Sequence, residues 1–174
     1  MNGTDAIVLQ AKPILEKDVL VELFTRELGR VRVFAKYAQS KKPRFGGQLN
    51  ALNVLNVRLI KKGTAFYLGQ TTVSNTFSEI KKDYNKIKVA YQFLHVIRSV
   101  TQMDQENKEL FDALLHYLEC MDQNNSLVLN EHKLAFYQHV LEIEGLMGES
   151  VKLNEHEVIK MIESYTNIHL KDIL

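Results

Sequence analysis

The chain has 174 residues and a net charge of +1, with 45% hydrophobic and 25% charged residues, the composition of an ordinary soluble globular protein. Its apolar content is too high for a disordered chain, and no run approaches the roughly 18 consecutive apolar residues of a membrane-spanning helix. The N-terminus lacks a secretory pattern, so we expect a cytoplasmic protein with no membrane partner, organised as one ordinary domain or two small ones.

The pattern of the first 80 residues predicts β-structure, because apolar side chains alternate or form short β-branched blocks between turn residues. Five short strands bury an apolar face most economically by curling into a small barrel, of either the OB or the SH3-like type. The expected strands are approximately Asp5 to Ala11, Val19 to Arg26, Arg30 to Tyr37, Leu52 to Ile60 and Ala65 to Val73.

From Lys81 onward the apolar spacing changes to three and four residues, which predicts three or four helices packed by one face. One helix is expected to end near Gly145, and a short final helix to follow the N-cap pattern of Asn154 and Glu157. The prediction is an α+β protein, with a five-stranded barrel domain over residues 1–80 and an all-α domain over residues 81–174.

The two halves of the chain carry opposite charges. Residues 1–80 contain 12 Lys and Arg against 6 Asp and Glu, a net charge of +6, whereas residues 81–174 contain 10 against 15, a net charge of −5. Because clustered positive charge attracts anionic partners, the basic half is the candidate site for a polyanion.

The most basic segment, residues 30–44, reads RVRVFAKYAQSKKPR and contains six cations and no acidic residue. Alternate side chains of a strand share a face, so Arg30, Arg32, Phe34 and Lys36 are expected to project together, away from Val31, Val33 and Ala35. Cations that follow a phosphate backbone, beside an aromatic ring that stacks an unpaired base, bind single-stranded nucleic acid. The predicted nucleic-acid-binding residues are Arg30, Arg32, Phe34, Lys36, Lys41, Lys42 and Arg44.

Other basic residues are weaker candidates. Lys61 and Lys62 flank Gly63 in an expected hairpin turn and extend the same surface only if that turn lies beside it. The face of Arg58 stays open because the register of its strand is not determined. Surface cations also keep small barrels soluble and protect strand edges, and this explanation accounts for any one of them.

Enzymatic chemistry is not expected, because the sequence has no phosphate-binding glycine loop, nucleophile elbow or paired metal-ligand motif. The single cysteine, Cys120, lies in an apolar helical pattern, and the six histidines have no compact zinc spacing. We therefore predict no catalytic residue, no cofactor and no metal.

Three segments carry a family resemblance: DAIVLQAKP, LFTRELGRVRVFAKYAQSKK and GGQLNALNVLNVRLIKKG. In this order, over most of residues 5–75, they resemble the N-terminal barrel of the RecO recombination mediator family. The most specific part runs from Leu23 to Lys36. In the helical half the resemblance is one of architecture and position.

The resemblance implies an OB-fold followed by a helical domain in a DNA repair and recombination mediator of the bacterial cytoplasm or nucleoid. It implies binding of single-stranded and double-stranded DNA, annealing of complementary strands, and two partners, the RecR protein and the single-stranded DNA-binding protein, which allow the RecA recombinase to load. Three features depart from the family: a lone Cys120 in place of a zinc-binding cysteine cluster, Tyr37 in place of a common glycine, and a shorter C-terminal end.

Two other functions remain open on the residues alone. One is a protein-interaction adaptor, in which the cations are only a solvated face and the acidic helical half binds a basic partner. The other is an RNA-binding barrel, since OB-folds serve both nucleic acids.

Overall fold

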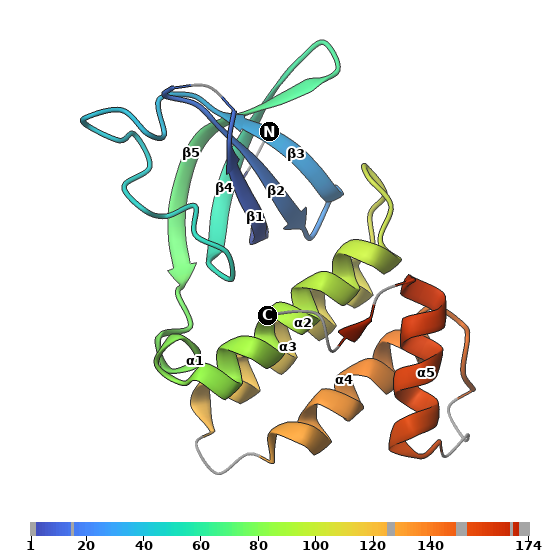
Figure 1. Cartoon of the computed structure of the whole chain (residues 1–174). Coiled ribbons are helices and arrows are strands. Elements are labelled where there is room, and N and C mark those ends of the chain that lie inside the picture. Colours follow the sequence, from blue (N-terminus) through green and yellow to red (C-terminus); the bar gives the residue numbers. More distant parts are fainter. Residues whose placement is uncertain (1–2, 15, 125–127, 149–152, 168, 171–174) are drawn as a thin grey trace. The chain divides into compact units, whose positions relative to one another are not determined.

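The computed structural model describes all residues except 1–2, 15, 125–127, 149–152, 168 and 171–174 (Figure 1). The chain divides into two compact units. Residues 1–76 and 103–108 form the barrel unit, and residues 77–102 and 109–174 form the helical unit.

Five strands close into a barrel in the order β1-β2-β3-β5-β4, with β4 pairing back onto β1. The β3–β5 pair is parallel and the other four pairs are antiparallel. This arrangement confirms the predicted OB-fold barrel and decides against the SH3-like alternative. The strands are β1 (Thr4–Pro13), β2 (Val19–Thr25), β3 (Gly29–Ala35), β4 (Val54–Lys62) and β5 (Ala65–Asn75).

The barrel closes because each strand turns one apolar row inward. In β3 the inward residues Val31, Val33 and Ala35 are fully buried, as their alternation predicts. Residues 36–53, which connect β3 to β4, lie on this core through Phe45 and Leu49. The long connection is therefore anchored to the barrel at two apolar points.

A second segment completes the barrel unit. Residues 103–108 follow the second helix, and there the amide of Asp104 donates to the carbonyl of Arg30 over 2.8 Å. Gly29, at the start of β3, has a φ of +67°, and a Cβ added to it would lie 1.7 Å from the carbonyl oxygen of Gln105. Only glycine fits this position, since both the backbone conformation and the close approach exclude a side chain.

The described part of the helical unit contains five α-helices, more than the three or four expected. The additional helix is α1 (Ser78–Lys82), which has a single buried apolar residue, Ile80, and so produces no helical repeat in the sequence. The carboxylate of Asp122 accepts hydrogen bonds from the amides of Glu79 and Ile80 at its first turn. The others are α2 (Tyr84–Val100), α3 (Lys108–Gln123), α4 (Leu129–Ile143) and α5 (Glu155–Thr166).

Helix ends follow the sequence signals where those signals are strong. Asn154 and Glu157 form the expected capping box at the start of α5, each side chain accepting a hydrogen bond from the other residue's amide. The helix α4 ends before Gly145, which has a positive φ. No described helix is long and apolar enough to cross a membrane.

Aromatic rings form the centre of the helical unit. Phe93 of α2 stacks on Phe136 of α4 with ring centroids 4.0 Å apart, and both are fully buried. His132 of α4 lies beside them, with Nε2 2.8 Å from the carbonyl oxygen of Tyr117, a geometry that suits donation by the ring N–H. The pKa of His132 is lowered, mainly by burial.

We expect the free energy of unfolding to fall as the pH is lowered below 6.5, the ordinary pKa of histidine. His132 and His95 both have lowered pKa values in the folded chain, so the unfolded chain binds more protons in this range. Urea denaturation at pH 7.5 and pH 5.5 measures the loss. His132→Gln, which keeps an N–H donor and does not titrate, is expected to lose less than the wild type, and an equal loss in both contradicts the assignment to His132.

We expect Gly29→Ala to destabilise the barrel by roughly 3 kcal/mol or more, because the new methyl group meets backbone in a left-handed conformation. Gly63 is the matched control, since it also has a positive φ but no atom of the described residues lies within 4 Å of the position that a Cβ would take there. Gly63→Ala should cost only about 1–2 kcal/mol. Equal losses in the two variants, measured by urea denaturation, contradict the close packing at Gly29.

Candidate nucleic-acid interface

The outer face of β3 carries the predicted polar row. Arg32 is exposed, and Arg30 and Phe34 are partly exposed, while the residues between them are buried. The pairing of β2 with β3 runs without a shift from Val19 with Ala35 to Thr25 with Gly29, so no bulge reverses the faces. Lys36 follows the strand and is also exposed. The expectation that these four side chains project outward is confirmed.

The parallel pairing of β3 with β5 creates an aromatic pair on this face. Phe34 lies opposite Tyr67, and their rings stack with centroids 5.4 Å apart and planes at 29°. The ammonium groups of Lys36 and Lys62 lie 5.4 Å and 5.7 Å from the centroid of the Tyr67 ring. Two partly exposed rings are therefore stacked and two cations lie at one of them, a combination that suits a stacked base and its neighbouring phosphates.

We call this surface the platform face and define it by Arg32, Phe34, Lys36, Lys62 and Tyr67. Tyr67 is its one residue that the sequence analysis did not single out. Lys62 was only a weak candidate there, and the cation-π contact with Tyr67 now places it with Lys36. Tyr67 was missed because its link to Phe34 is a parallel pairing between residues far apart in the chain, for which the sequence has no local signal.

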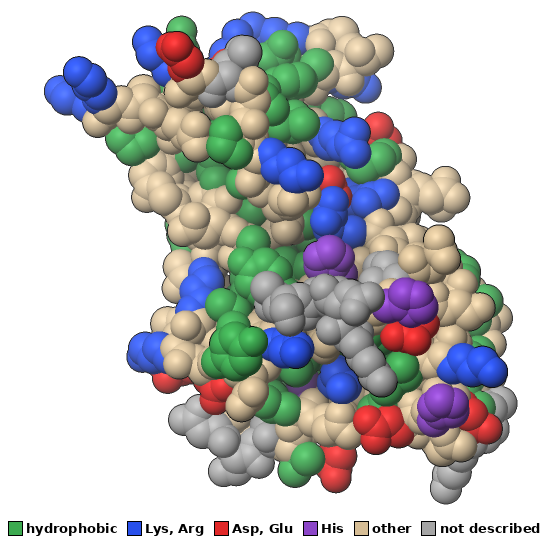
Figure 2. Space-filling view, viewed as in Figure 1, with side chains coloured by type: hydrophobic (Ala, Val, Ile, Leu, Met, Phe, Trp, Pro, Cys, Tyr) green, Lys and Arg blue, Asp and Glu red, His purple; other side chains and the backbone are tan. Residues whose placement is uncertain are grey.

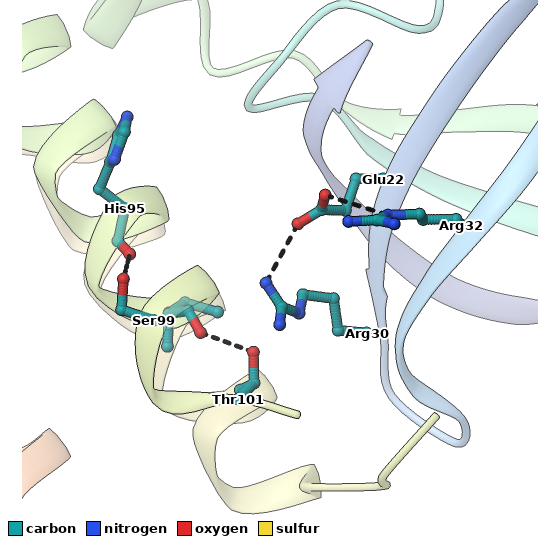
Figure 3. A network of polar contacts seen from close by, with 7 residues as sticks. Glu22, Arg30, Arg32, His95, Ser99 and Thr101 are labelled. Carbon is teal, nitrogen blue, oxygen red and sulfur yellow. Dashed lines mark hydrogen bonds and ion pairs between the residues drawn. The ribbon is translucent and has the colours of Figure 1, made fainter. Parts of the chain in front are cut away.

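Residues 30–44 contain no acidic residue, but a carboxylate from the neighbouring strand lies close to two of their arginines. Glu22 of β2 lies opposite Arg32 and points toward both arginines (Figure 3). Its carboxylate is 3.3 Å from Nη1 of Arg30 and 3.9 Å from Nε of Arg32. A count along the chain overlooks this contact because the acid comes from the neighbouring strand.

Glu22 divides the two arginines into different roles. The side chain of Arg30 is only 17% exposed and its Nη1 faces Glu22, whereas the side chain of Arg32 is 63% exposed and still faces solvent. Arg32 therefore keeps the geometry of a phosphate-binding residue. Arg30 instead has a structural role in the barrel wall beside Arg32.

The connection after β3 brings the last three predicted cations to the surface. Lys41, Lys42 and Arg44 are exposed. The guanidinium of Arg44 donates to the carbonyl of Gly69 over 2.7 Å and lies 5.3 Å from the ring centroid of Phe45. Arg44 is thus held against β5, two residues beyond Tyr67.

Two further basic residues of β4, Arg58 and Lys61, have different surroundings. Arg58, whose face the sequence left open, is exposed and pairs in register with Gln70 of β5. Lys61 instead lines a pocket of about 460 Å³ that also contains three carboxylates. Such a pocket repels phosphate, so we leave Lys61 out of the platform face. Its lining residues are Glu27, Leu28, Lys61, Gly63, Thr64, Phe66, Asp104 and Glu106.

The distribution of charge over the surface agrees with a candidate interface on the barrel. On the face of the molecule in Figure 2, several Lys and Arg side chains gather over the barrel, and Asp and Glu are more frequent over the helices.

Among the described residues, no group of three or more His, Cys, Asp or Glu side chains has the geometry to hold a metal ion. Cys120 contacts His116, with Sγ 3.6 Å from Nε2.

Comparison with known proteins gives a family match that ends close to residue 76, where the first segment of the barrel unit ends. Residues 1–77, which contain every residue of the platform face, match the family described as Recombination protein O N terminal. The DNA repair protein RecO of Caldanaerobacter subterraneus subsp. tengcongensis is 30% identical over 145 residues, which are 83% of this chain and 57% of that protein. Over residues 1–77 the chain carries the N-terminal domain of the RecO family.

Other RecO proteins align in the same way. The DNA repair protein RecO of Myxococcus xanthus is 32% identical over 144 residues, 82% of this chain and 58% of that protein. That of a Thermoanaerobacter species is 29% identical over 120 residues, 69% of this chain and 48% of that protein. The chain therefore spans about half the length of the curated RecO proteins that it matches.

The different exposure of the two arginines predicts different effects on stability. Glu22→Gln should destabilise the barrel by about 1–3 kcal/mol, because the largely buried charge of Arg30 loses a carboxylate. Arg32→Gln removes an exposed and longer ion pair and should cost less than about 0.5 kcal/mol. Urea denaturation of the two variants measures both values. A larger loss for Arg32→Gln than for Glu22→Gln contradicts the division of roles.

Proposed function

We propose that this chain acts in DNA repair and recombination by binding single-stranded and double-stranded DNA on the platform face and annealing complementary strands. The observation that carries the proposal is the stacked pair of Phe34 and Tyr67 with Lys36 and Lys62 at the Tyr67 ring. The name that its relatives share, DNA repair protein RecO, supports the same function.

The two kinds of residue on this face have complementary tasks. Lysine and arginine side chains neutralise phosphates and release counterions, which binds any strand irrespective of its sequence. An exposed ring adds about 1–3 kcal/mol for each unpaired base that stacks on it. Arg32 and Lys36 suit the first task, and Phe34 and Tyr67 suit the second.

Annealing follows from the same contacts without covalent chemistry. Two complementary strands repel each other through their phosphates, and a basic surface that neutralises both lowers this repulsion. Bases held apart from their own strand neighbours then have free edges with which to find their complements. The exposed cations of the connection, Lys41 and Lys42, extend the basic surface beyond the single track of β3.

The proposal includes the partners that the family resemblance implies. In this account the chain works with the RecR protein and the single-stranded DNA-binding protein to help load the recombinase onto single-stranded DNA. It assigns no catalytic residue and no cofactor, since annealing and loading require binding energy alone.

Binding of single-stranded DNA should depend steeply on salt. Six exposed cations belong to the platform face and the connection: Arg32, Lys36, Lys41, Lys42, Arg44 and Lys62. If each neutralises one phosphate, the logarithm of affinity should fall with the logarithm of salt concentration with a slope of about −4. The double variant Arg32→Glu with Lys36→Glu should bind at least about tenfold more weakly, with a slope shallower by about 1.4.

The matched control makes the same change of charge elsewhere. Lys82 on α1 and Lys160 on α5 are both exposed, and both belong to the helical unit rather than to the barrel unit. The double variant Lys82→Glu with Lys160→Glu should therefore bind DNA nearly as tightly as the wild type. Equal binding by the wild type and both double variants overturns the proposal and favours a protein-interaction adaptor. Preference for RNA in competition with a DNA strand of matched sequence favours an RNA-binding barrel.

A further inference from the structure

Tyr37 is exceptional among the residues with a strained backbone. Five described non-glycine residues have a positive φ, a conformation that bulky L-residues adopt at an energetic cost. Asp104 and Asn167 are of the types that tolerate it best. Two others have buried side chains, as Leu52 is 1% exposed and Phe77 is fully buried.

Tyr37 has neither a residue type that tolerates a positive φ nor a buried side chain. Its φ is 60°, and 58% of its surface is exposed to solvent. Burial in the core therefore does not explain why a bulky aromatic residue occupies this position, where glycine is free of strain. Strained residues that folding does not require are most often found at functional sites.

Hydrogen bonds hold the backbone of Tyr37 in this conformation. Its amide donates to a carboxylate oxygen of Asp18 over 2.9 Å. Its carbonyl accepts from the amides of Ser40 and Arg44, and from the hydroxyl of Ser40 over 3.1 Å. The backbone that carries the ring is thus held in place at the start of the connection, and this backbone loses little conformational freedom when a ligand binds.

The surroundings of Tyr37 favour a polyanion with flat bases. Lys36 precedes it, and Lys41 and Lys42 follow it, all three exposed. Tyr37 lies three residues after Phe34, so their Cα atoms are at most about 11 Å apart. We propose that Tyr37 stacks an unpaired base of single-stranded DNA and extends the track that begins on the platform face into the connection. This inference rests on the proposed function of that face.

Two variants of Tyr37 test the inference. Tyr37→Gly removes the ring and suits the left-handed backbone, so its midpoint of urea denaturation should be no lower than that of the wild type. Its affinity for a fluorescent oligothymidylate should fall by about 5-fold to 150-fold, the range for one stacked base, while its affinity for a duplex of equal length stays within about 2-fold. Tyr37→Phe keeps the ring and should bind both DNAs within about 2-fold of the wild type.

The double variant Arg32→Glu with Lys36→Glu, measured beside them, separates the two proposals. If Tyr37→Gly binds the single strand as tightly as the wild type while the double variant has lost affinity, the role of Tyr37 is overturned and the platform face stands. Equal losses of Tyr37→Gly for single strand and duplex also overturn base stacking. A wild-type protein that binds no single strand overturns both.

Discussion

The parallel pairing of β3 with β5 is the constraint on which the rest of this structure depends. It closes the barrel, because without it the order β1-β2-β3-β5-β4 leaves two open edges. It also places Phe34 opposite Tyr67, so that two rings from distant parts of the chain stack on the outer wall. The contact that completes the fold is therefore the contact that creates the candidate interface.

The position of each cation on this wall matters more than the number of cations. Arg30 is mostly buried and faces Glu22 of β2. Arg32, two residues further along β3, keeps most of its side chain in solvent. Lys36 and Lys62 approach the same aromatic ring from two different strand ends. The cations are thus held around the rings, which favours a ligand that combines phosphates with flat bases over a simple anion.

Features that depend on residues close together in the sequence were predicted, and features that depend on residues far apart in the sequence were missed. Alternation within β3 predicted which side chains face outward, because the period of a strand is a local property. The capping box at Asn154 and Glu157 was predicted for the same reason. Tyr67 and Glu22 were missed, since a parallel partner and a cross-strand acid depend on how strands pair, and the short helix α1 buries too little apolar surface to leave a pattern.

The most direct test of the central claim is to map where a bound single strand touches the barrel. An oligonucleotide carrying photoreactive 5-iodouracil, cross-linked to the intact chain and analysed by mass spectrometry of the peptides, identifies the aromatic residues in contact with bases. The account predicts cross-links at Phe34 and Tyr67, on adjacent strands of one wall. Cross-links confined to β1, β2 or the helical unit would contradict it.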